Sequence, residues 1–282
     1  MQESNKVIRL TEVVFGMEES NIDNLFIELA GETRRSMLQI LARRDEKLSK
    51  IAEILDISIQ DAHRNSSRLV KCGLIDKKSD SLFYLTSLGI SISQQLDSFE
   101  FLAKNNQFFR THTLGNLEPK FIRRIGDLTN SKYVTGMGPV LETLKRIAKG
   151  AERTINLSST QYPLDTARVV VEKANQNISI RYIFDHHTTV PQKEREELLK
   201  NTSWRRHISE GIVKRKMVEK LHVCLTSTEK EAIVFFPDLK GNNDMISGFF
   251  STDPVFLDWC EDYFEHVWNN ANSFDESKLV KI

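Results

Sequence analysis

The stretch that most limits how this chain can fold is "LSKIAEILDISIQDAHRNSSRLVKCGLI" at residues 48–75. Its first part repeats apolar residues at helical spacing, and a three-residue break separates it from a second helical run. Ser58 followed by Asp61 resembles a capping box, and Gly73 suits the C-terminal end of a helix. The stretch therefore predicts two short helices joined by a tight turn, the second running from Ile59 to the residue before Gly73.

The second helix has an apolar side and a polar side. The apolar positions that we expect to face the core are Ile59, Ala62, Leu69 and Val70. The expected outer face carries Gln60, Asp61, Arg64, Asn65, Arg68 and Lys71. After this helix, "LIDKKSDSLFYLT" predicts two short strands around a turn with two lysines. Helix, turn, capped helix and basic hairpin follow one another in the order of a winged helix-turn-helix.

Such a fold gives each polar residue a possible role. In a DNA-binding helix, Arg and Asn side chains can make bidentate contacts to base edges, while lysines reach phosphates. The candidates for base contact are Arg64, Asn65 and Arg68, with Gln60 near the helix N-terminus in the groove. The candidates for phosphate contact are Lys71, Lys77 and Lys78. The alternative is an ordinary solvated face, since most charged residues lie at the surface whatever the function.

Charge is balanced over the whole chain, with 39 Lys and Arg against 39 Asp and Glu. The distribution is uneven, however. Residues 31–78 hold eleven Lys and Arg against seven acidic residues, whereas residues 253–276 hold seven acidic residues and neither Lys nor Arg. Because a phosphate backbone responds to charge within a Debye length, the N-terminal region is the better candidate for nucleic-acid binding.

Cysteine usage and hydropathy indicate where the protein works. The three cysteines are odd in number and far apart, which favours a reduced compartment over a disulfide framework. No apolar run approaches the length of a membrane span, and the N-terminus lacks the residue order of a signal peptide. We therefore expect a cytoplasmic protein.

The residues from about Gly31 to Gly89, ending in "YLTSLG", resemble the winged-helix domain of archaeal ArsR-type transcription regulators. The resemblance implies a domain at 21–89 that binds double-stranded DNA at a pseudo-palindromic operator. Residues 1–20 precede it as a segment of unclear structure.

An apolar stripe follows the winged helix and predicts a linking helix over 90–115. Its residues are Leu88, Ile92, Leu96, Phe99 and Leu102. This spacing is coiled-coil-like and favours a homodimer, in which two recognition helices lie about one DNA turn apart. The alternative packs the stripe against its own winged domain.

The C-terminal part, predicted as a domain over 125–272, begins with alternating strands and helices. "KYVTG", "TINLSS" and "ISIRYIFD" read as strands separated by helices, and "KLHVCLTS", "EAIVFFP" and "MISGFF" as antiparallel strands. A charged helix is expected near 193–201, and a final helix begins after Asp253. We predict an α/β chain, α+β overall, whose C-terminal domain has a mixed sheet.

This half resembles the effector domain of archaeal regulators related to the methanogenesis regulatory protein. The resemblance is carried by "IRYIFD" and by "EAIVFFPDLKGNNDMISGFFSTDPVFLDWCEDYFEHVW". It implies a catalytically silent, phospholipase-D-like fold and an effector-sensing or dimerisation role.

The active motif of phospholipase D needs His, then Lys two residues on, then Asp five residues further, so that a His nucleophile attacks a phosphoryl group that Lys clamps. Here His222 is followed by Cys224 and Glu229 at those positions, so the lysine is missing. We therefore expect no enzyme activity.

Two further polar clusters lie in this half. "DHH" at 185–187 ends a strand, and residues 205–220 are rich in Lys and Arg. The basic cluster is either a solvated face or a patch for an anionic effector or the DNA backbone. Adjacent strand residues point to opposite faces, so we expect no metal at 185–187, and no cofactor. The candidate effector-binding residues are Asp185, His186, Arg205, Lys214, Arg215 and His222.

The sequence thus predicts a one-component, homodimeric DNA-binding transcription regulator whose DNA affinity is modulated through its C-terminal domain. Two alternatives remain. One is a phosphodiesterase-like enzyme in the C-terminal domain, and the other is a protein-interaction module that uses the winged helix and the acidic final helix.

Overall fold

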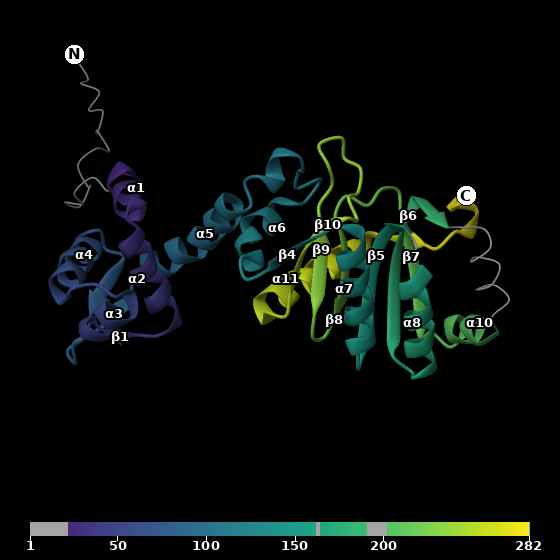
Figure 1. Cartoon of the computed structure of the whole chain (residues 1–282), viewed down its shortest axis with the longest axis horizontal. Helices are drawn as coiled ribbons and strands as arrows, with labels where there is room; N and C mark the ends of the chain where they lie inside the picture. The colour runs from purple at the N-terminus through teal and green to yellow at the C-terminus, as the bar shows by residue number, and fades with distance from the viewer. Residues whose placement is uncertain (1–21, 162–163, 191–201, 282) are drawn as a thin grey trace, which may run out of the picture. The chain divides into compact units, whose positions relative to one another are not determined.

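The fold is that of a computed structural model, which describes residues 22–161, 164–190 and 202–281. The segment 1–20 and the helix predicted near 193–201 therefore lie outside the described residues. The chain divides into two compact units, Met1–Gln94 and Gln95–Ile282 (Figure 1).

The first unit has the element order of a winged helix-turn-helix. Its helices are α1 (Ile22–Ala30), α2 (Glu32–Arg43), α3 (Leu48–Leu55) and α4 (Ile59–Lys71). Its strands are β1 (Glu46–Lys47), β2 (Ile75–Lys77) and β3 (Leu82–Leu85), in the sheet order β1–β3–β2. The strands β2 and β3 form the predicted hairpin, with Ile75 opposite Leu85 and Lys77 opposite Phe83.

The core of this unit is closed by one side of α4. Ala62 and Leu69 are fully buried, together with Met37, Leu38 and Ile51 from α2 and α3. The predictions for Ile59 and Val70 are wrong, since these side chains are 55% and 40% exposed. At 3.6 residues per turn, both lie beside the row of buried α4 residues. The buried face of α4 is therefore narrower than its apolar residues predict.

The helix α5 (Ser87–Lys104) follows the winged hairpin. It is shorter than the linking helix predicted over 90–115, because the amides of Asn105 and Asn106 donate to the carbonyls of Phe101 and Ala103 and compete with continued helix. The chain then forms a 3₁₀ turn, η1 (Phe108–Arg110).

The second unit contains a mixed sheet in the order β11–β7–β6–β5–β8–β9–β10–β4, with β12 beside β6. Its strands are β4 (Lys132–Thr135), β5 (Thr154–Gln161), β6 (Ser179–Val190), β7 (Val213–Val218), β8 (Cys224–Thr228), β9 (Ala232–Phe235), β10 (Ser247–Ser251), β11 (Asn272–Ser273) and β12 (Val280–Lys281). The strand β6 pairs in parallel with both β5 and β7. From β5 onward, the pairs β5–β8, β8–β9, β9–β10 and β10–β4 are antiparallel.

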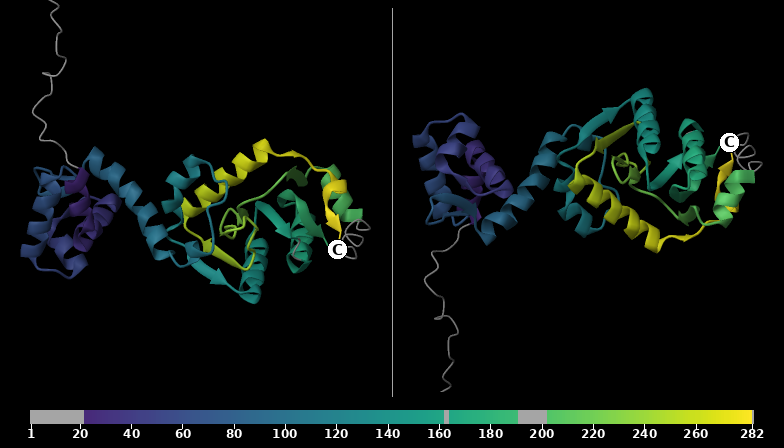
Figure 2. Two further views of the ribbon diagram at one scale, coloured as in Figure 1. Left: turned by 90° about the horizontal axis from the view of Figure 1, so that it is seen from above. Right: turned by 90° about the horizontal axis from the view of Figure 1, so that it is seen from below.

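Helices cover both faces of this sheet. They are α6 (Pro119–Arg123), α7 (Met137–Gly150), α8 (Leu164–Asn175), α10 (Thr202–Ser209) and α11 (Pro254–Asn270), with 3₁₀ turns η2 (Ile125–Leu128) and η3 (Glu276–Lys278). Figure 2 shows α7 and α8 on one side of the sheet and α11 on the other. The predicted fold class, α/β with a mixed C-terminal sheet, is therefore confirmed.

The sequence prediction lacks the two-residue strands β1, β11 and β12 and one longer strand, β7. In the β7 sequence "VKRKMV", Val213 and Met217 are buried and three basic residues lie between them. Because of its basic residues, this segment is interpreted from the sequence as a solvated charged face and not as a strand.

Alternation along β5 and β6 fixes which helix each residue meets. Ile155 and Ile180 are buried in the cluster beneath α8. Their neighbours Asn156 and Arg181 face α11, where the Arg181 guanidinium donates to Asn156 Oδ1 at 2.9 Å and Glu261 Oε1 at 2.9 Å, and also to Glu265. The acidic residues of α11 thus help hold the helix on its own sheet.

The first residues of α5 lie close to the turn after α4, and this gives a stability prediction. A Cβ on Gly89 would stand 1.9 Å from the carbonyl oxygen of Leu74, so Gly89→Ala must displace α5. We expect a loss of about 1–3 kcal/mol in the free energy of unfolding, as overpacking typically costs. Gly150, at the end of α7, has nothing within 4 Å of the added atom and is the matched control.

Chemical denaturation of the two variants would measure this difference. Gly150→Ala should leave stability unchanged or raise it by up to about 1 kcal/mol, since alanine favours helix. Equal stability of Gly89→Ala and the natural chain would contradict the packing described for α5.

Candidate nucleic-acid interface

Both ends of α4 are fixed by local hydrogen bonds. At the N-terminus, Ser58 Oγ accepts from Asp61 N at 3.0 Å and donates to Asp61 Oδ2 at 2.7 Å. At the C-terminus, Gly73 has φ of +72° and its N–H donates to Val70 O, while Leu74 N donates to Leu69 O. This is the Schellman pattern, in which glycine adopts the left-handed conformation. The predicted cap and stop are confirmed, and they set the position of every side chain on α4.

The structure places most of the predicted contact residues at the surface. The exposed residues of this set are Gln60, Arg64, Arg68, Lys71, Lys77 and Lys78. Arg64 forms an ion pair with Asp61 at 2.8 Å, yet its side chain is 73% exposed. Lys78 in the hairpin turn pairs with Asp45 at 2.5 Å, which offsets part of its charge.

Asn65 is the exception, and its assignment to the outer face is wrong. Its side chain is only 8% exposed, its Nδ2 donates to Asp61 O, and its Oδ1 accepts from Arg34 Nη1 at 3.1 Å. A buried amide with both groups engaged joins α4 to α2 rather than presenting itself to a ligand.

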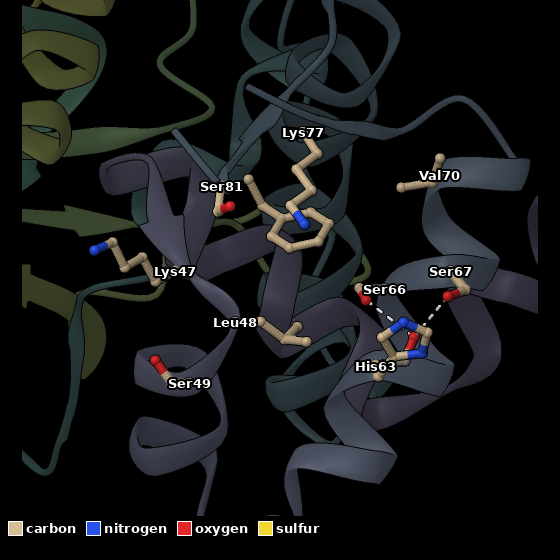
Figure 3. A pocket seen from close by; sticks show the side chains of 10 residues that line it. Lys47, Leu48, Ser49, His63, Ser66, Ser67, Val70, Lys77 and Ser81 are labelled. Carbon is tan, nitrogen blue, oxygen red and sulfur yellow. Dashed lines mark hydrogen bonds between the residues drawn. The ribbon is translucent and has the colours of Figure 1, made fainter. Parts of the chain in front are cut away.

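A groove lies between α4 and the hairpin, with a volume of about 510 Å³. Its lining residues are Lys47, Leu48, Ser49, His63, Ser66, Ser67, Val70, Lys77, Ser81 and Phe83. Figure 3 shows Lys47 and Ser49 on one side, His63 and Ser67 on the other, and Lys77 between them. None of the described residues that line it is acidic, so the groove is suited to an anion.

Sequence reasoning missed most of this groove. Its lining residues His63, Lys47 and Ser49 are absent from the candidates that the sequence suggests. Lys47 and Ser49 lie at the start of the first helix of the pair. They reach the groove because β1 pairs with β3, with Lys47 opposite Leu82. A two-residue strand leaves no periodic pattern that would reveal this pairing.

On the other edge of α4, Arg68 faces α1. Its Nε and Nη2 donate to the two carboxylate oxygens of Glu28, each at 2.8 Å. The bond to Arg68 and the charges of both Arg34 and Arg68 outweigh burial and lower the pKa of Glu28. The exposed face of α4 therefore has the hairpin on one side and α1 on the other.

The six candidate effector residues of the C-terminal unit do not converge on one site. Asp185 is buried and accepts from the backbone N–H of His187 and Leu221, so it fixes a loop. Arg205 and Lys214 are exposed, and His186 lies near Lys278. The Arg215 guanidinium stacks over Phe274 at 4.1 Å. Within this set, the charge of Asp185 affects the pKa of His222, which follows Leu221, whose N–H donates to Asp185.

His222 lines a small cavity of about 150 Å³. Its Nε2 lies 2.9 Å from Asn116 Nδ2, and burial and the charge of Lys220 lower its pKa against the opposing effect of Asp185. The cavity is lined by Asn116, Glu118, Phe121, Lys220, Leu221, His222, Tyr263, His266 and Val267.

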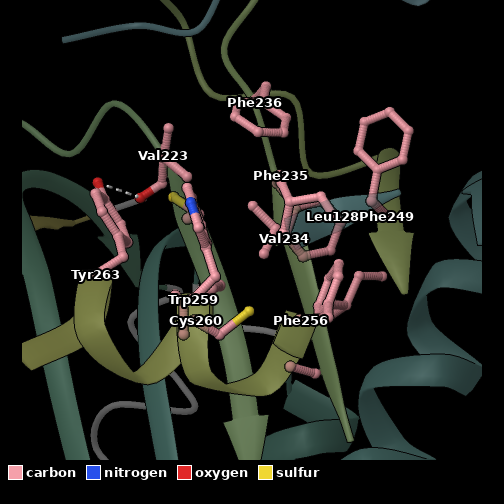
Figure 4. Close-up of a cluster of buried hydrophobic side chains, with 14 of the residues drawn as sticks. Leu128, Val223, Val234, Phe235, Phe236, Phe249, Phe256, Trp259, Cys260 and Tyr263 are labelled. Carbon is pink, nitrogen blue, oxygen red and sulfur yellow. Dashed lines mark hydrogen bonds between the residues drawn. The ribbon is translucent and has the colours of Figure 1, made fainter. Parts of the chain in front are cut away.

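The position that phospholipase D fills with lysine is occupied by a thiol in the core. Cys224 is fully buried, and burial raises its pKa to about 12. Its neighbour Val223 lies in the core with Trp259 and accepts a hydrogen bond from Tyr263 (Figure 4). Glu229, at the aspartate position, accepts from the backbone N–H of Glu152 at 2.7 Å. The lysine position of the motif therefore holds an uncharged thiol in the core, and the lysine that lines the cavity with His222 is Lys220, which lies outside the motif spacing.

The described ranges 22–161, 164–190 and 202–281 contain no cluster of three or more His, Cys, Asp or Glu side chains placed to bind a metal ion. Within the same ranges, no helix combines the length and apolar character needed to cross a bilayer.

Comparison with known proteins gives only distant matches. No family model matches the chain, and no curated protein matches it. Among solved structures, TrmBL2, an archaeal chromatin protein, is similar over 92% of this chain and 100% of its own, with 11% identity and a TM-score of 0.39. NucT from Helicobacter pylori covers 51% of this chain and 99% of its own, with 12% identity and a TM-score of 0.40.

A third similar structure is ZitR from Lactococcus lactis, over 35% of this chain and 68% of its own, with 22% identity and a TM-score of 0.26. All these values are too low to assign a function. The chain's own geometry defines its class: a winged helix-turn-helix unit followed by an α/β unit with a mixed sheet.

Proposed function

We propose that this protein is a sequence-specific, DNA-binding transcription regulator of the one-component, archaeal ArsR-like type that its sequence resembles. It would act in the cytoplasm as a homodimer. The observation that carries the proposal is the surface formed by α4 and the hairpin, where an exposed polar helix face borders a groove with lysines and no acidic lining residue among those described.

The outer face of α4 supplies the groups that base recognition needs. Gln60 and Lys71 lie at its centre, and Arg64 lies beside them with a largely exposed side chain. An arginine in the major groove can bind guanine O6 and N7 in a bidentate manner, and glutamine can do the same with adenine. The exposed Ser67 adds a hydroxyl group on the same face.

The groove beside α4 supplies phosphate contacts. Lys47 and Lys77 supply ammonium groups to its lining, and the hydroxyl groups of Ser49 and Ser81 can donate to phosphate oxygens. Lys78 would approach the same strand of DNA from the turn. Base contacts thus come from the centre of α4, and phosphate contacts from the groove and hairpin.

The homodimer would form through α5. Along the stripe predicted to face a partner, Leu88 is 49% exposed and Phe99 is 61% exposed, whereas Leu96 is buried within the protein. The exposed positions leave apolar surface for a second copy. A two-fold pair of recognition helices would then read a pseudo-palindromic operator.

Modulation through the C-terminal unit would involve the cavity at His222. Asn116, which contacts His222, lies in the chain segment that follows α5 and η1. A small molecule that binds this cavity better in one arrangement of the segment would shift the population of the dimer and hence its affinity for DNA.

The DNA-binding proposal predicts two different effects on operators selected from a random DNA pool. Arg64→Ala should cost about 1–3 kcal/mol on the selected site and relax one base preference. Lys77→Ala should weaken binding to all sequences alike and flatten the dependence of affinity on salt by about one unit of slope. Fluorescence anisotropy over a salt series would measure both.

Lys132→Ala, an exposed lysine of β4 in the second unit, is the matched control and should change neither quantity. If Arg64 and Lys77 were replaced together and affinity stayed the same, the assigned surface would not be the one that binds DNA.

The dimer proposal predicts that Phe99→Asp yields monomers, because a charge in an apolar interface must be desolvated without a partner. Gln94→Asp places the same charge on an exposed polar position of α5 and should leave the dimer intact. Analytical ultracentrifugation at micromolar concentration distinguishes the two. A natural chain that sediments as a monomer would count against the homodimer.

A further inference from the structure

Arg68 is not free to meet DNA in this structure, because Glu28 of α1 holds it. The contact is bidentate, with Nε to Oε2 and Nη2 to Oε1 both at 2.8 Å. This is the strongest geometry for an arginine–carboxylate pair. The Arg68 side chain nevertheless remains 45% exposed, at the edge of the recognition face.

Glu28 has a second cationic partner. Arg34 Nε lies 2.9 Å from Glu28 Oε2, and the Arg34 side chain is only 11% exposed. Arg34 also donates to the carbonyl of Ile27 and to Asn65 Oδ1, so it ties α1 to α2 and α4. Of the two ion pairs of Glu28, the pair with Arg34 is therefore the one that holds the helices together.

The two pairs differ in what their loss would leave behind. One carboxylate lies between two guanidinium groups, so this cluster of three residues has one positive charge in excess. If Arg68 left, Glu28 would keep Arg34, and no buried charge would be left without a partner. Arg68 would pass from one anionic group to another, and the desolvation penalty of a broken buried pair would not arise.

We propose that Glu28 is a competitor for Arg68 built into the fold, and that a DNA phosphate takes Arg68 from it when the protein binds. This inference rests on the proposed DNA-binding function. Glu28 is then a residue that sets DNA affinity without touching DNA. It keeps the recognition face weaker for DNA than its count of cations would suggest.

The test is a double-mutant cycle on full-length protein with Glu28→Gln, Arg68→Ala and both together. Removing the competitor should raise the affinity for duplex DNA about two- to fivefold, the range typical of an exposed ion pair. In the Arg68→Ala background, Glu28→Gln should have no effect beyond that of the lost charge. Arg68→Ala alone should lower affinity and flatten the salt dependence.

The matched control is Glu53→Gln, which removes an exposed carboxylate of α3 that pairs with Lys50. It changes the charge of the same unit equally, so the gain from Glu28→Gln must exceed it. Glu28→Asp is the second variant, because it keeps a negative charge for Arg34 but is too short to reach both partners. It should also raise affinity, even if Glu28→Gln weakens the fold seen by thermal unfolding.

The outcomes separate this inference from the function on which it rests. If the natural protein binds no DNA at any salt concentration, both are overturned. If it binds DNA but folded Glu28→Asp and Glu28→Gln bind no better than Glu53→Gln, only the competition is overturned. The same conclusion follows if their gain persists in the Arg68→Ala background.

Discussion

The surface that we assign to DNA depends on how the two ends of α4 are held. Ser58 closes the N-terminal end and Gly73 turns the chain at the C-terminal end, so the helix has a fixed length and rotation. Leu69 and Ala62 then pack inward, and at 3.6 residues per turn this sends Gln60, Ser67 and Lys71 outward. The same rotation brings Arg68 to α1 and His63 to the hairpin. A change at either end would move all these groups together, whereas a change on the exposed face moves only one.

The charged side chains of this protein differ in whether they are paired within the fold, and the balanced total charge does not show this. In the acidic helix α11, carboxylates form ion pairs within the protein: Glu261 pairs with Arg181, and Asp262 pairs with Arg124. This weakens the alternative in which its acidic face is a protein-binding surface. In the first unit, the groove lysines have no acidic neighbour among the described lining residues, while Lys78 and Arg68 are paired with Asp45 and Glu28. In the winged unit, the groove lysines can therefore meet an anion directly, whereas Lys78 and Arg68 must first leave the carboxylates with which they pair.

Local signals were read correctly from the sequence where one residue type fixes the backbone. The cap at Ser58, the stop at Gly73 and the alternating strands β5 and β6 were all predicted because they depend on neighbours in the chain. The burial of Asn65 and the exposure of Ile59 were not, since both depend on how α2 and the hairpin pack against α4. Tertiary contacts bring Lys47 to the groove and Glu28 to Arg68, and such contacts produce no periodic pattern in the sequence. For the effector residues, strand alternation separated positions that are adjacent in sequence.

Hydrogen–deuterium exchange of the full-length protein, with and without duplex DNA at low salt, tests the central claim most directly. The account predicts slower exchange on DNA binding in α4, in the turn at residues 77–81 and at the start of α3, because these segments line one face. Slower exchange confined to the second unit, with α4 and the turn unchanged, would contradict it.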